Sequence, residues 1–65
     1  MLVGFDHITA SGKRVHVNPA SVESVHDDVG MAGTATLVLS GERKVVVKGN
    51  ADEVARIINE ALQRP

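Results

Sequence analysis

Cysteine is absent from this sequence, and aromatic side chains are almost absent, since Phe5 is the only one among 65 residues. Without cysteine, neither a disulfide nor a thiolate metal site can stabilise the chain. A chain this short buries a small share of its surface when it folds. We therefore expect a single domain over residues 1–65 with a thin aliphatic core, stabilised further by association into a homo-oligomer.

The sequence also lacks an excess of either charge. Seven basic and eight acidic residues give a net charge of −1 with neutral histidines. Proteins that bind nucleic acid usually carry a basic excess, because their affinity comes from neutralising phosphates. A single aromatic residue offers no platform on which bases of a single strand could stack. Composition thus argues against nucleic acid as the main partner, and a weak nucleic-acid binder is the third-ranked hypothesis.

Long apolar runs are missing as well. No stretch approaches the roughly 18 apolar residues of a membrane-spanning helix. The first four residues, Met-Leu-Val-Gly, lack the basic start and apolar stretch of a signal peptide. We expect a cytoplasmic protein with no membrane partner.

The clearest element that is present is a C-terminal helix over residues 51–64. Its apolar residues recur at helical spacing and form one stripe, made of Val54, Ile57, Ile58, Ala61 and Leu62. Asn50 is a favourable N-cap, and Glu53 stands three residues later, as in a capping box. The stripe must pack on a sheet, because the rest of the chain has strand character.

Five segments are typical of strands, at about residues 3–9, 13–18, 22–26, 34–39 and 43–48. Short connections make neighbours in sequence pair in space. We predict an α+β fold: an antiparallel β-meander of about five strands with one C-terminal helix packed on it. An SH3-like half-barrel is the nearest alternative architecture.

The first pair of strands is expected to turn at Ser11-Gly12. A two-residue turn there would place His7 opposite His16 and Ile8 opposite Val15. Phe5 would then lie on the outward face with the two histidines. Two opposed imidazoles could hold zinc with a third ligand, but the sequence offers no evident third ligand, so we expect no metal and no cofactor.

The last pair of strands turns at Gly41-Glu42. A two-residue loop would scramble the two faces, whereas a three-residue loop keeps Leu37 and Leu39 inward with valines. The three-residue loop is therefore predicted. The residues of the outward face are then Thr34, Thr36, Val38, Lys44, Val46 and Lys48.

Two candidate sites follow from these faces. Basic and hydroxyl groups on the outward side could bind an anion such as a nucleotide phosphate, with free N–H groups at the helix start beside Lys48. The residues of this candidate ligand site are Arg14, His16, Thr36, Lys44 and Lys48. Apolar residues on a sheet face that should be exposed to solvent indicate a protein interface instead. The residues of this candidate interface are Phe5, Val38 and Val46.

Catalytic signals are lacking. The serines have no nucleophile-elbow context, and no pair of carboxylates lies in an evident cleft. The Gly30-Met31-Ala32-Gly33 segment matches the Gly-x-x-Gly pattern of a phosphate-clamping loop only in its residue spacing. It joins two strands and follows two aspartates, which would repel a phosphate. We interpret it as a hairpin tip and expect no enzyme activity.

Taken in order, the segments resemble a known family. They are a glycine-turn hairpin, Val17-Asn18-Pro19, Val22-Glu23-Ser24-Val25, Thr36-Leu37-Val38-Leu39, a glycine turn, Val45-Val46-Val47-Lys48 and an acidic-capped helix. This order is similar to that of the small FlbD-type flagellar proteins and of related short bacterial and phage proteins, over about residues 7–62. The resemblance implies a non-enzymatic β-meander with a helix.

The leading hypothesis is a small non-catalytic, oligomeric interaction or regulatory module of bacterial or phage origin. The alternative is an oligomeric protein that sequesters a small anionic, nucleotide-like ligand between protomers. The family resemblance favours the first hypothesis, and the basic, threonine-containing face favours the second.

Overall fold

A computed structural model describes residues 1–8 and 13–63 of the chain. Within them the elements are β1 (Val3–Asp6), β2 (Arg14–Val17), a 3₁₀ turn η1 (Pro19–Ser21), β3 (Val22–Asp27), β4 (Thr34–Leu39), β5 (Arg43–Lys48) and α1 (Ala51–Gln63). Across these ranges the predicted α+β fold, with five antiparallel strands and a C-terminal helix, is confirmed. The predicted Ser11-Gly12 turn lies outside the described residues.

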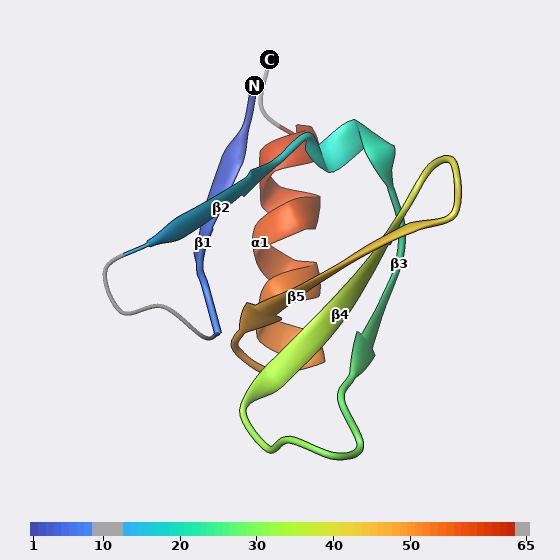
Figure 1. Cartoon of the computed structure of the whole chain (residues 1–65). Coiled ribbons are helices and arrows are strands. Elements are labelled where there is room, and N and C mark those ends of the chain that lie inside the picture. The colour runs from blue at the N-terminus through green and yellow to red at the C-terminus, as the bar shows by residue number, and fades with distance from the viewer. Residues whose placement is uncertain (9–12, 64–65) are drawn as a thin grey trace.

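The strands form two antiparallel sheets, β1-β2 and β3-β4-β5 (Figure 1). A bridge between His7 and Val47 joins the end of β1 to β5. α1 lies across one side of the strands and contacts β3, β4 and η1. The SH3-like description is not confirmed by this arrangement and stays a prediction.

The register of the first hairpin differs from the predicted one. Phe5 lies opposite Val15, and His16 lies opposite Gly4 rather than His7. The pairing continues to the His7 N–H, which donates to the Lys13 carbonyl at 3.0 Å, so the connection is longer than two residues. The residue opposite His7 is thus Lys13 instead of His16, a register shift of three residues. A shift by an odd number of residues exchanges the two faces of a strand. Phe5 therefore points inward.

The predicted outward position of Phe5 is consequently wrong. Its side chain is 5% exposed and belongs to the core. The physical reason is burial, because the ring carries the largest apolar surface in β1. Removing a buried phenylalanine side chain costs about 3–5 kcal/mol of folding stability, which a thin core cannot easily replace.

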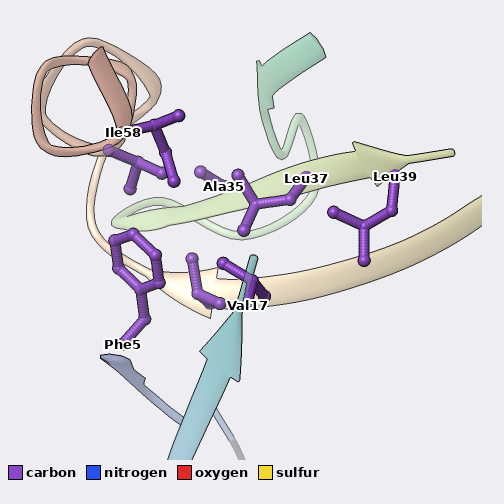
Figure 2. Close-up of a cluster of buried hydrophobic side chains, with 8 residues drawn as sticks. Phe5, Val17, Ala35, Leu37, Leu39 and Ile58 are labelled. Carbon is purple, nitrogen blue, oxygen red and sulfur yellow. The ribbon is translucent and has the colours of Figure 1, made fainter. Parts of the chain in front are cut away.

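The core contains the inward residues of both sheets and two residues of α1 (Figure 2). The ring of Phe5 points from β1 toward this cluster on the side of Ile58. The buried apolar residues are Phe5, Val17, Ala35, Leu37, Leu39, Val47, Val54 and Ile58. The set is aliphatic apart from Phe5, as the composition predicts.

The second hairpin has the predicted register. Leu39 pairs with Arg43, which leaves the three residues 40–42 as the loop. Gly41 and Glu42 both adopt positive φ, 79° and 63°. Glycine tolerates this region freely, whereas Glu42 does so at some cost. Leu37 and Leu39 are buried, so this part of the sequence-based prediction is confirmed.

The helix start is held by two side chains. The Asn50 Oδ1 accepts a hydrogen bond from the Glu53 N–H at 2.8 Å, which confirms Asn50 as the N-cap. The Asp27 Oδ1 accepts from the Ala51 N–H at 2.8 Å, and this bond joins the end of β3 to the helix. Val54 and Ile58 are buried as predicted, but Leu62 is 52% exposed.

Candidate binding surface

The candidate surface is the side of the β3-β4-β5 sheet that faces away from the core, called the outer face below. Strand register assigns to it Ser24, His26, Thr34, Thr36, Val38, Lys44, Val46 and Lys48. His26, Thr36 and Val46 form one row across the strands. Ser24, Val38 and Lys44 form the adjacent row. Polar and apolar side chains are thus mixed on a single sheet face.

The centre of the outer face is apolar and the β5 side is basic. Val38, Val46 and Thr36 are half-buried by their neighbours, while Lys44 and Lys48 are exposed. Both lysines flank Val46 on the same strand face, because side chains two residues apart point the same way.

Thr34 differs from the other members of the face. It is 7% exposed, and its hydroxyl donates to the Met31 carbonyl at 2.8 Å. Its polar group is therefore used to hold the β3–β4 connection rather than offered to a ligand.

Ser24 and His26 were not predicted as part of any site. The His26 Nε2 and the Ser24 Oγ lie 2.9 Å apart on the exposed side of β3. A bulge between Val22 and Ser24 shifts the pairing with β4. Alternation along residues 22–26 alone could have placed both side chains on one face, but the partner strand could not be read from it.

The candidate ligand residues fall on two different sheets. Thr36, Lys44 and Lys48 share the outer face, whereas Arg14 and His16 belong to the β1-β2 sheet. The structure therefore brings three of the five residues together within one protomer and separates the other two from them.

Arg14 already has a partner. Its Nη1 lies 3.0 Å from the Asp6 Oδ1, and both side chains are more than half exposed. Gly4, on the neighbouring strand, leaves room for the side chains of Arg14 and His16. A Cβ at Gly4 would lie 2.7 Å from the Arg14 Nη2 and 3.0 Å from the His16 Cε1. The charge of Arg14 is thus compensated within its own hairpin.

The helix start beside Lys48 has two of its first three N–H donors already in use. Asp27 occupies the Ala51 N–H, and Asn50 occupies the Glu53 N–H. Asp52 and Glu53 add negative charge in the first turn. An anion at the outer face would therefore depend mainly on side chains.

The proposed histidine pair is separated as well. His16 faces Gly4, whereas His7 pairs with the Lys13 backbone and bridges to Val47. Within residues 1–8 and 13–63 no three histidine or acidic side chains are grouped for metal binding.

The β3–β4 connection, residues 28–33, is hydrogen-bonded at several points. The Asp28 Oδ1 accepts from the Gly30 N–H at 3.0 Å, and the Gly33 carbonyl accepts from the Gly49 N–H at 2.7 Å. Val29 is fully exposed at its tip, and Met31 is 49% exposed. The hairpin tip predicted at this position thus presents apolar side chains on a hydrogen-bonded loop.

Comparisons of the chain with protein-family models, with curated proteins and with solved structures each return no match. Among the described residues, α1 is too short and too polar to cross a membrane.

Proposed function

We propose that this chain is a small non-catalytic interaction module that self-associates and meets its partner through the outer face. The observation that carries the proposal is the apolar centre of that face, Val38 and Val46, on the side of the sheet opposite the core. Protein interfaces typically place apolar residues at the centre and charged residues at the rim.

The arrangement of charge on the outer face supports this proposal. Val46 lies opposite Thr36 in the middle strand, and Lys44 lies opposite Val38. The cations therefore stand beside the apolar centre, where they can stay hydrated while the valines are covered. The resemblance to FlbD-type proteins agrees with a regulatory module of this kind and with bacterial or phage origin.

Val46→Glu tests the interface. Lys44 and Lys48 flank the site, so the folded monomer accommodates a carboxylate there, whereas a second chain packed on the face would bury it. We expect wild-type protein at about 10 μM to associate and the variant to weaken association at least about tenfold, a change of roughly 1.4 kcal/mol. Light scattering measures the mass, and circular dichroism verifies the fold.

Asn59→Glu is the matched control, because it adds the same charge at an exposed position on α1. It should associate like the wild type. A wild-type mass of 6.9 kDa at that concentration, with a fully folded spectrum, would exclude self-association through the outer face.

The second candidate function is capture of a small anionic, nucleotide-like ligand between protomers. Its support is the cluster of Thr36, Lys44 and Lys48 on one face, next to His26. Arg14 and His16 would have to come from a neighbouring protomer, since they lie on the other sheet.

Lys48→Ala tests this candidate. A charge-assisted hydrogen bond contributes roughly 1.5–3 kcal/mol, so the variant should bind about 10- to 150-fold more weakly without unfolding. Calorimetric titration with nucleotides and cyclic dinucleotides measures the affinity. No heat across the panel leaves the protein-interaction proposal standing. Unchanged binding by the variant would place the ligand elsewhere.

A further inference from the structure

The large exposed apolar residues of the described chain gather at two ends of the molecule. They are Met1, Leu2, Val29, Met31 and Leu62. Scattered exposed apolar residues are ordinary, but a grouping of them indicates a contact surface. One group, Val29 and Met31, lies on the β3–β4 connection, and the other lies where the chain begins and where α1 ends (Figure 1).

The first of these ends, called the loop end, comprises residues 27–33 and 48–53. Two hydrogen bonds unite its parts, from the Gly49 N–H to the Gly33 carbonyl and from the Ala51 N–H to the Asp27 Oδ1. Both ends of the loop that carries Val29 are thereby anchored. A contact surface that is already ordered loses little conformational entropy on binding.

The opposite end, called the terminal end, comprises residues 1–2, 40–44 and 61–63. Val3 pairs with Val17 just before η1, and the Ser40 N–H donates to the Ser21 carbonyl at 2.9 Å. Figure 1 shows the chain start, the end of α1 and the β4–β5 turn on the side away from the β3–β4 connection. Leu2 and Leu62 are 64% and 52% exposed there.

The charges of the two ends differ. The loop end carries four carboxylates and the cation Lys48, the carboxylates being Asp27, Asp28, Asp52 and Glu53. Two loop ends therefore repel one another. Arg43 and Lys44 lie at the terminal end with Glu42, and Glu23 lies at the start of β3, across β4 from them. Neither of these two cations takes part in an ion pair within the described residues.

We propose that the loop end of one copy binds the terminal end of the next. Val29 and Met31 would pack on Leu2 and Leu62, and the carboxylates of the loop end would meet Arg43 and Lys44. Charge complementarity selects this pairing over contact between two loop ends, because juxtaposed carboxylates are repulsive.

The association is head-to-tail, uses two different surfaces and leaves Val38 and Val46, the apolar centre of the outer face, free. Repeated contacts of this kind close into a ring or extend as a filament, depending on the rotation between copies. This head-to-tail contact is additional to the proposed function, because neither the loop end nor the terminal end contains Val38 or Val46.

Two variants, each blocked at one end, test the proposal. Both are made in a Val46→Glu background, so that the outer face does not contribute. Val29→Asp blocks the loop end, and Leu62→Glu blocks the terminal end. Sedimentation is measured at protein concentrations up to about 1 mM, which suits weak contacts. The Val46→Glu parent should associate, each blocked variant alone should be monomeric, and the two mixed should form a 1:1 pair.

The mixture is decisive because each blocked variant retains the end that the other has lost. A mixture that stays monomeric overturns the proposal, as does a blocked variant that associates like the parent or a parent that is monomeric. If Leu62→Glu fails to fold by circular dichroism, Leu2→Glu replaces it at the same end. Wild-type association that Val46→Glu abolishes, with no end-dependent pairing, would leave the outer-face proposal intact and remove only this one.

Discussion

Phe5→Ala is expected to remove most of the stability of this domain. The ring is 5% exposed and lies in the core, and truncating a buried phenylalanine costs about 3–5 kcal/mol. Small domains have roughly 0.05–0.15 kcal/mol of stability per residue, so a chain of this length has about 3–10 kcal/mol in total. Urea denaturation followed by circular dichroism measures the loss.

Asp6→Ala is the control on the same strand. Asp6 points outward and its ion pair with Arg14 is exposed, and such pairs contribute about 0–1 kcal/mol. If Phe5→Ala and Asp6→Ala destabilise equally, Phe5 does not occupy the core and the register of the first hairpin is the one expected from a two-residue turn.

Ile58→Ala is expected to cost about 2–5 kcal/mol, because its buried side chain contributes to the packing of α1 on the sheets. Gln63→Ala, at an exposed position of the same helix, should stay within about 0.5 kcal/mol. Thermal or urea unfolding of the two variants measures the difference. Equal effects would show that α1 packs through another face.

The register of the second hairpin could be predicted because only one loop length places all of its alternating apolar residues on the same face. Ala35, Leu37 and Leu39 alternate strictly, and a three-residue loop keeps them inward with Val45 and Val47. The helix was equally clear, since its apolar stripe and its N-cap agree. In both segments, local pattern and tertiary packing demand the same arrangement.

The first hairpin could not be predicted because its apolar residues disagree in parity. Val3 and Phe5 favour one inward face, whereas Ile8 favours the other. The sequence-based prediction followed Ile8 and the glycine turn, and the structure follows Phe5. The register shift of three residues, being odd, moved Phe5 from the predicted interface into the core.

The candidate surface was predicted for the residues on β4 and β5 and missed for those on β3. The bulge between Val22 and Ser24 changes the register locally, and a sequence pattern carries no direct signal for such a bulge. Separation of Arg14 and His16 from the lysines was also hidden, because it depends on how the chain divides into two sheets.

The bond between Asp27 and Ala51 has a consequence for how this chain folds. It joins residues 24 positions apart, so the first N–H of α1 gains its partner only after the β3-β4-β5 meander has brought the two together. An isolated helix of 13 residues is marginal in water. The helix should therefore consolidate together with the sheet, in one cooperative step, rather than serve as an early template on which the strands assemble.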